Sequence, residues 1–340
     1  MITNTMETQL YHALHKGATV QPRSNAGVLM LEDADRVDFL HRMTTNDIAR
    51  LQPGHSTVTV LTNPTARVLY AFTVMAFPNK LYCLPMVGQT DTLRKHLRSQ
   101  IFFMDKVKVT NLSSDVTRIR IMGPEAVSLA QKVLLAQELP TTDLSESPEG
   151  AFFQKSGSQG VTYILKQNQF DVPGVEVMVP NAESESLIQS LCQEGAVLLT
   201  DEDAYNARRI EVGQPAVGHE LRDEYNPLEV GLQWTCAENK GCYTGQEIIA
   251  RQITYDKITK TLVGLRASSP MVEGTDVMVD GRKAGQVTSA AYSPLLEAHV
   301  GLAVLKRPQN QPGVHVHLAD TDAEVMSLPL SLKETTAESV

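Results

Sequence analysis

The pattern of apolar residues changes near residue 259, and this change constrains the possible folds most strongly. Before it, strand-like runs alternate with segments of helical spacing; after it, six short β-rich runs follow one another, with glycine and proline between them. Short, evenly spaced strands without helices indicate a small β-barrel or sandwich. We therefore expect a larger region at residues 1–258, a C-terminal β-barrel at 259–332 and a flexible polar tail at 333–340.

The larger region divides again, into two α+β units of similar order. The first has expected strands at 26–32, 57–61, 67–76 and 80–85 and expected helices at 33–51 and 90–102. Further along the chain, strands are expected at 106–110 and 117–122, a helix from 123 to about 137, strands at 161–165 and 175–179, and a helix that Asn181 caps and that runs to about 195. The polar, proline-containing stretch 138–150 is typical of an exposed connection. The fold class is α+β.

Composition excludes several classes of protein. The 340 residues are 42% hydrophobic, which supports more than one core, and the net charge of −9 argues against nucleic acid as a general partner. Four cysteines without a C-x-x-C pair indicate free thiols in a reducing compartment. No secretory or transit signal and no long apolar run is visible, so we expect a cytoplasmic protein without a membrane partner.

Glu211 occupies an unusual place in its expected helix. If that helix ends at Gly213, the carboxylate lies in the last turn, where the helix dipole favours cations. Glu211 is therefore expected either to pair with a nearby arginine or to bind a ligand, and the sequence leaves both alternatives open.

The segment from Lys240 to Glu247 places glycines on both sides of Cys242 and Tyr243. Such a loop allows the backbone to approach a ligand closely. The neighbouring Lys240 favours a reactive thiolate at Cys242, whereas free cysteines are more often small buried apolar residues. No second cysteine or histidine stands at metal-ligand spacing, so no metal site is expected.

The same segment, K-G-C-Y-T-G-Q-E, resembles the K-G-C-[FY]-x-G-Q-E signature of the YgfZ-type folate-binding proteins, relatives of the glycine-cleavage T-protein, an aminomethyltransferase. Residues 209–213 with 218–220 resemble the R-x-E-x-G…G-x-E element of both families, and 39–47 resembles their N-terminal segment. The resemblance covers nearly the whole chain. It implies an aminomethyltransferase-like folate-binding body, a C-terminal β-barrel and tetrahydrofolate, or a derivative of it, as cofactor.

The resemblance also implies roles for particular residues. Glu211 would bind the pterin, because a carboxylate can accept hydrogen bonds from its two adjacent N–H donors. Lys240 and Arg251, with Lys257 and Lys260, could meet the glutamate tail of folate or form an ordinary solvated face. Tyr243 and Trp234 could contact the ring or belong to a core. The complete set of expected cofactor-binding residues is Glu211, Arg209, Lys240, Tyr243, Gln246 and Arg251, and Cys242 is the expected functional thiol.

One departure from the T-protein concerns its acidic pair. Tyr70 and Ala71 stand where the T-protein has two aspartates, one of which is needed for methylene transfer. Without that carboxylate, aminomethyl transfer should fail. The resemblance then implies a tetrahydrofolate-binding accessory protein that supports iron–sulfur cluster assembly or repair, with iron–sulfur client or assembly proteins as partners. It would lie in the cytoplasm, or in an organellar matrix if the source is eukaryotic.

Two alternatives remain open at this point. The chain could be a folate-dependent one-carbon transferase that uses another carboxylate, such as Asp47 or Glu220, although Asp47 could instead brace its helix. A folate-linked role in RNA modification is the other, and the net charge of −9 makes it less attractive.

Overall fold

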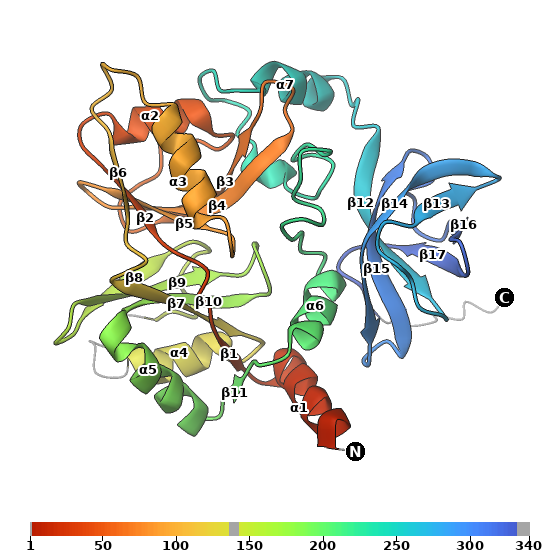
Figure 1. Ribbon diagram of the computed structural model, residues 1–340, viewed down its shortest axis with the longest axis horizontal. Coiled ribbons are helices and arrows are strands. Elements are labelled where there is room, and N and C mark those ends of the chain that lie inside the picture. Colours follow the sequence, from red (N-terminus) through yellow and green to blue (C-terminus); the bar gives the residue numbers. More distant parts are fainter. Residues whose placement is uncertain (1, 136–142, 332–340) are drawn as a thin grey trace.

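The computed structural model describes residues 2–135 and 143–331, with side chains from residue 9 onward. Figure 1 shows two sheets with their helices on one side of the molecule and a barrel on the other. The first sheet has the strand order β3-β4-β5-β2-β6: Ser56–Thr62, Val68–Ala76, Leu81–Pro85, Leu29–Glu32 and Lys108–Asn111. All of its neighbouring strands are antiparallel.

Two helices cover this sheet, α2 (Arg36–Met43) and α3 (Thr90–Ser99). In α3 the buried leucines Leu93 and Leu97 are four residues apart, so one face of the helix packs on the core while its basic face is exposed to solvent.

The second sheet has the order β11-β1-β7-β10-β9-β8. Its strands are Val197–Leu198, Thr19–Pro22, Val116–Met122, Gly174–Pro180, Val161–Gln167 and Phe152–Ser156, and only the β1–β11 pair is parallel. Helices α4 (Ala126–Leu134) and α5 (Asn181–Gln193) pack on it through an aliphatic core.

The C-terminal strands close into a barrel in the order β12-β15-β14-β13-β16-β17. They span Lys260–Ala267, Ala298–Lys306, Arg282–Ser293, Asp276–Val279, His315–His317 and Asp322–Met326. Small and branched side chains such as Val263, Ala303 and Val325 fill its interior. Closure leaves no long unpaired edge.

Helix α6 (Glu202–Glu211) joins the parts. It packs against α1 (Ile2–Lys16) on one side and against barrel strands β14 and β15 on the other, as Figure 1 shows. After α6 the chain makes a short 3-10 turn, η1 (Gln233–Thr235), and then α7 (Gln246–Thr254) before it enters the barrel.

The structure confirms the expected α+β class with two sheet-and-helix units and a small barrel. The helix expected over 33–51 is wrong in length, because α2 ends at Met43 and Asn46 then bonds β3 through Thr57 Oγ1 and the Val58 carbonyl. Asn181 does not cap α5; it is the first helical residue, and its amide donates to the Ser114 carbonyl. Helix α1 and strands β1, β8 and β11 were not expected from the sequence.

The expected connection at 138–150 is described only from residue 143, and the expected tail lies outside the described residues. Among the described residues, no helix is both long enough and apolar enough to cross a membrane.

Candidate functional site

The loop that carries Cys242 is fixed to α2 by Lys240. Its ammonium donates to three backbone carbonyl oxygens, that of His41 in the last turn of the helix (2.6 Å) and those of Thr44 (2.6 Å) and Asn46 (2.7 Å) just after it. Such carbonyls have no partner within a helix, and a cation complements the negative end of the dipole. Burial lowers the pKa of Lys240 to about 8. The Lys240 side chain therefore has a structural role at this point.

The neighbouring residues of the loop divide between buried and exposed. Tyr243 is buried under the Lys240 ammonium, 4.9 Å from its ring centroid, and burial raises the pKa of its hydroxyl. Gly245 has φ 83°, and a side chain there would meet the backbone of the β3–β4 turn at Asn63 and Ala66. Cys242 itself is exposed, unlike a buried apolar cysteine.

A small cavity of about 260 Å³ lies beside this loop, between residues 236–239, which follow η1, and helix α7. Cys236, Tyr243 and Gln246 are among the residues that line it. Burial raises the pKa of Cys236 to about 11, so this thiol stays protonated at neutral pH. Arg251 points to solvent on α7 and pairs with Glu247 at 3.1 Å, as an ordinary helix-surface pair does.

Arg209 and Glu220, from the R-x-E-x-G…G-x-E element, form a buried ion pair. Arg209 Nη1 lies 3.3 Å from Glu220 Oε2, and Arg209 Nη2 donates to Ser289 Oγ at 2.8 Å. Ser289 in turn donates to Glu220 Oε1 at 2.6 Å. This triad joins α6, the loop after it and barrel strand β14.

Glu211, two residues after Arg209, lies on another side of α6 in a second polar cluster. One carboxylate oxygen accepts hydrogen bonds from Tyr11 and from Ser293 Oγ (2.7 Å). The other lies 2.9 Å from His15 Nε2 and 3.2 Å from Arg208 Nη1. Burial alone would raise the pKa of Glu211, but the close contact with His15 and the hydrogen bonds from Tyr11 and Ser293 lower it below its usual range. Glu211 thus holds together α1, α6 and β14.

A cleft of about 440 Å³ opens beside α6, on the Arg209 side. Arg23, Tyr205, Arg209 and His219 give it polar walls, and Met86 and Val217 give it an apolar one. Glu202 and Asp203, from the first turn of α6, also line it. The mixture of apolar surface and a few convergent polar groups is typical of a small-molecule site.

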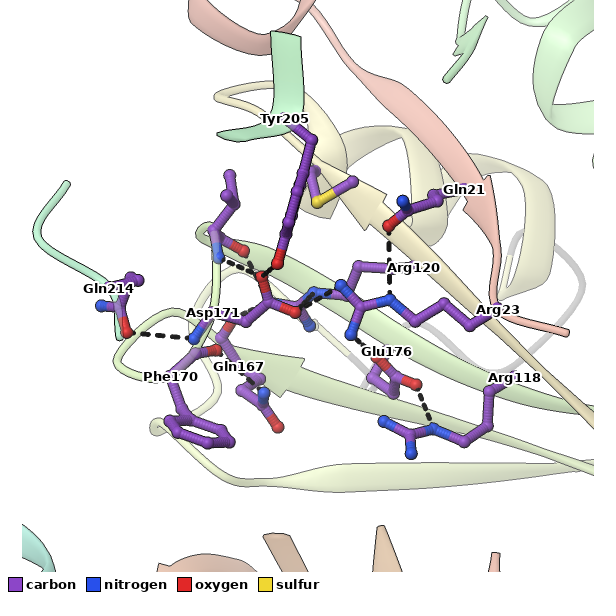
Figure 2. Close-up of polar contacts among 12 residues, drawn as sticks. Gln21, Arg23, Arg118, Arg120, Gln167, Phe170, Asp171, Glu176, Tyr205 and Gln214 are labelled. Carbon is purple, nitrogen blue, oxygen red and sulfur yellow. Dashed lines mark hydrogen bonds and ion pairs between the residues drawn. The ribbon is translucent and has the colours of Figure 1, made fainter. Parts of the chain in front are cut away.

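A buried ionic cluster, shown in Figure 2, includes Arg23 and Tyr205, which also line this cleft. Arg23 donates to Asp171, and its Nη1 lies 3.9 Å from Glu176. Arg118, on β7, donates to Glu176 at 2.6 Å, and Tyr205 donates to Asp171 at 2.7 Å.

Arg120 completes this cluster from the same face of β7. Its Nη2 donates to the carbonyl oxygens of Gln167 and Val172, both at 2.7 Å, while Nε and Nη1 are buried and form no hydrogen bond with the residues that the structure describes. Burial would raise the pKa of Asp171, but Arg23 and Arg120 lower it. Three guanidinium groups therefore face two carboxylates, an excess of one positive charge beside the cleft.

Sequence reasoning missed this cluster. A signal was present, because Arg118 and Arg120 alternate with isoleucines in β7, and Glu176 stands in the otherwise apolar strand β10. Charged residues at every second position of a buried strand require partners on the same face.

Tyr70 and Ala71, at the positions of the T-protein acidic pair, lie on β4. Ala71 is 1% exposed and belongs to an apolar cluster with Val60, Leu221 and Val230. Met86 and Val217, which pack against this cluster, also line the cleft. Tyr70 packs against His96 of α3, with 5.7 Å between ring centroids. No carboxylate stands at either position, and the surroundings of Ala71 are apolar.

The expected site residues fall into two groups. Arg209 and Glu211 lie on α6, whereas Lys240, Cys242, Tyr243, Gln246 and Arg251 lie in or beside the loop before α7, which Figure 1 shows at the top of the molecule. Of the expected cofactor-binding residues, only Arg209 lines the cleft. Their binding roles stay predictions.

Comparison with known families assigns the chain to one of them. The model of the GCVT N-terminal domain matches residues 5–240, and that of the glycine cleavage T-protein C-terminal barrel domain matches residues 260–330. The chain belongs to the glycine cleavage T-protein family.

Several relatives in this family align with most of the chain. A chloroplastic protein of Arabidopsis thaliana, named provisionally as a transferase, is 30% identical over 320 residues, which are 93% of this chain and 71% of that protein. The aminomethyltransferase of Caldanaerobacter subterraneus is 25% identical over 91% of this chain and 82% of its own.

The crystal structure of the glycine cleavage system aminomethyltransferase T from Bartonella henselae has the same fold. It superimposes with a TM-score of 0.83 at 19% identity, over 95% of this chain and 89% of that one. The aminomethyltransferase-like fold expected from the sequence is therefore confirmed, and the family assignment is to the T-protein superfamily; these comparisons contain nothing specific to its YgfZ branch.

Proposed function

We propose that this member of the T-protein family is a tetrahydrofolate-binding accessory protein of the YgfZ type, which supports iron–sulfur cluster assembly or repair in client enzymes. The observation that carries the proposal is the exposed Cys242 thiol on a loop that Lys240 holds against α2. A fixed, accessible thiol suits contact with a partner protein better than a buried one does. Folate is proposed because the family is the folate-dependent aminomethyltransferase superfamily.

The cleft beside α6 fits a folate in size and chemistry. Its apolar wall, with Met86 and Val217, suits a planar ring, and its carboxylates Glu202 and Asp203 could accept from pterin N–H groups. Arg23 and Arg209 are both held in buried ion pairs, but the cluster that contains Arg23 has an excess of one positive charge, which would attract the glutamate tail. Glu211, the anchor that the family motif implies, does not line this cleft, so it marks a different place for the pterin on another side of α6, where binding would require Glu211 to exchange its hydrogen bonds from Tyr11 and Ser293.

Glycine-cleavage chemistry is not proposed, because an apolar cluster surrounds Ala71. The two carboxylates considered as replacements, Glu220 and Asp47, each bind other residues of the protein. Glu220 is fully buried against Arg209 and Ser289, and Asp47 braces its own turn through Arg50 and His41.

The second candidate is a folate-dependent one-carbon transferase. Glu202 and Asp203 favour it, since they line the cleft and could supply a carboxylate to an amine substrate. The names of the aminomethyltransferase relatives are consistent with this chemistry. Formation of methylene-tetrahydrofolate from a lipoyl-bound aminomethyl group would favour the transferase over the accessory protein.

Localisation and partners follow from the same proposal. We place the protein in the cytoplasm, or in an organellar matrix if the source is eukaryotic, and the chloroplastic name of the Arabidopsis relative fits the second case. Folate and iron–sulfur client or assembly proteins are the proposed partners.

Calorimetric titration with tetrahydrofolate tests the first half of the proposal. We expect the wild type and Cys242→Ala to bind alike, and Glu211→Gln, checked for folding by circular dichroism, to bind more weakly. A wild type that does not bind tetrahydrofolate would reject the folate part.

Complementation tests the second half. In cells that lack the gene, we expect the wild type to restore the activity of an iron–sulfur enzyme and Cys242→Ala not to restore it. Full restoration by Cys242→Ala would reject the role of the thiol.

A further inference from the structure

Three consecutive large apolar residues are exposed between α3 and β6. Phe102 is 69% exposed, Phe103 97% and Met104 74%. Their neighbours Ile101 and Val107 pack against the core of the first sheet, so only the tip of the turn faces outward. Burying apolar side chains of this size is favourable, and a contiguous exposed group of them usually marks a binding surface.

Asp105 holds this turn in a defined conformation. Its carboxylate accepts from the Phe102 N–H at 2.9 Å and from Arg42 Nη2 at 2.5 Å, while its own N–H donates to the Phe102 carbonyl at 2.9 Å. The three apolar side chains are thus presented in advance, which lowers the entropic cost of binding.

The chain on both sides of the turn is rich in basic side chains, and we call these residues its basic rim. Residues 91–108 contain five lysine or arginine and two acidic side chains, in a chain whose net charge is −9. Arg94 pairs with Asp91 and Lys108 with Glu32, but among the described residues Lys95, Arg98 and Lys106 form no ion pair. An apolar tip within a positive rim is complementary to an acidic surface with an apolar recess.

Helix α2 connects this surface to Cys242. Arg42 binds the turn through Asp105, and the preceding residue, His41, accepts from Lys240 of the thiol loop. A side chain at Gly241, next to Cys242, would meet the His41 ring, because a Cβ there would lie 3.8 Å from His41 Nε2. In Figure 1 the loop after α3 and the loop before α7 both rise to the upper end of the molecule, beside α2.

We infer that the turn 102–104 and its basic rim are a docking surface for a protein partner with an acidic surface around an apolar recess, and that α2 places this partner beside the Cys242 thiol. The inference rests on the proposed role of Cys242 as the functional thiol. A protein occupant is favoured over a lipid bilayer because the surface continues to that thiol, for which a bilayer offers no reaction partner.

Thiol–disulfide exchange with two matched peptides tests this inference. Each peptide carries one cysteine as a mixed disulfide with thionitrobenzoate. In both peptides leucine and phenylalanine alternate with a charged residue, which is glutamate in the acidic peptide and lysine in the basic one. The Cys242 thiolate attacks the peptide sulfur, the new disulfide joins Cys242 to the peptide, and the coloured thionitrobenzoate leaves. Rates measured with Cys242→Ser are subtracted.

We expect the acidic peptide to react about tenfold faster than the basic one at low salt, and the difference to shrink as salt rises. Phe103→Ser and the double variant Lys95→Glu, Arg98→Glu should each remove most of the difference. Matched changes on the barrel, Val272→Ser, at a residue that is 68% exposed, and Arg282→Glu should leave it intact.

Equal rates for the two peptides with the wild type would overturn the docking surface, as would a difference that survives Phe103→Ser. A small neutral mixed disulfide, 2-hydroxyethyl thionitrobenzoate, separates the two possible failures. If it reacts with Cys242 while the peptides are not distinguished, the docking surface fails alone; if it does not react, the proposed thiol role fails and the inference falls with it.

Two other occupants are outcomes of separate measurements. Sedimentation with vesicles of equal parts phosphatidylcholine and phosphatidylserine, lost in Phe103→Ser, would replace the protein partner by a bilayer. A dimer in analytical ultracentrifugation, lost in the same variant, would replace it by a second copy of this chain.

Discussion

The ammonium of Lys240 lies 2.6 Å from the carbonyl oxygen of His41, so a loop late in the chain closes the end of a helix near its beginning. Two further carbonyl contacts, to Thr44 and Asn46, fill the remaining donor positions of the ammonium. The conformation of the Cys242 loop therefore depends on α2.

Replacing Lys240 by methionine should loosen this loop. Hydrogen bonds from a charged donor contribute roughly 1.5–3 kcal/mol, so we expect the free energy of unfolding in urea to fall by about 2 kcal/mol. Alkylation of the buried Cys236 should accelerate as well. Lys257→Met, on the exposed surface, is the control and should change stability by less than about 0.5 kcal/mol; equal losses in the two variants would contradict the role of Lys240.

The Arg209–Glu220 pair should be strongly coupled. Removing one member of a buried pair leaves the other charge without compensation, at a cost of about 3–5 kcal/mol. We expect Arg209→Met and Glu220→Gln each to lose this much in chemical denaturation, and the double variant to lose much less than the sum. Arg251→Met, which removes an exposed pair with Glu247, should cost about 0.5 kcal/mol or less. Additive losses in the double variant would show that the pair is not coupled.

Glu211 should contribute to acid sensitivity. Its pKa is lower in the folded protein than in the unfolded chain, where it is near 4.5, so its stabilising effect is complete above that value and is lost as pH falls through the folded pKa. As pH falls below 5, the stability of the wild type should therefore drop more steeply than that of Glu211→Gln. Thermal unfolding of both proteins at a series of acidic pH values measures this difference. Parallel curves for the two proteins would mean that Glu211 does not titrate differently on folding.

Introducing an aspartate at Ala71 tests the apolar character of that position. A carboxylate at a site only 1% exposed, without a partner, should cost about 3 kcal/mol or more at neutral pH and less at pH 5, where it becomes protonated. Differential scanning calorimetry at the two pH values gives the comparison. The neighbouring Tyr70→Asp, half-buried against His96, is the control and should cost less. An unchanged melting temperature for Ala71→Asp would show that water or a cation reaches the position.

Much of the fold could be predicted because its signals are local. The strands of the barrel alternate and are separated by glycine and proline, and Leu93 and Leu97 give α3 its helical spacing. The local signal was weaker for α2, where the helical spacing continues past Met43 but the side chain of Asn46 bonds to β3. Strand β1 is four residues long, and its place in the sheet depends on β7 and β11.

The sequence identified residues of the candidate site, but it did not predict which other residues they contact. The K-G-C-Y-T-G-Q-E segment identified an unusual loop, yet nothing in it indicates that Lys240 would bind carbonyls of α2. Glu211 was expected to have either a pairing role or a ligand role, and the structure gives it partners on α1 and β14. The cleft beside α6 is formed by segments that are far apart in the sequence, from Gln21 to His219.

The order of most elements, the change to an all-β region near residue 259 and the lack of an acidic pair at Tyr70 and Ala71 can all be read from the amino-acid sequence. They depend on periodicity, turn residues and residue identity, which are properties of short stretches. Which charges meet is instead a property of the folded molecule. Tyr11 and Glu211 are 200 residues apart, and such a contact forms only when packing of α1 on α6 brings the two side chains together and removes the water that would otherwise separate them.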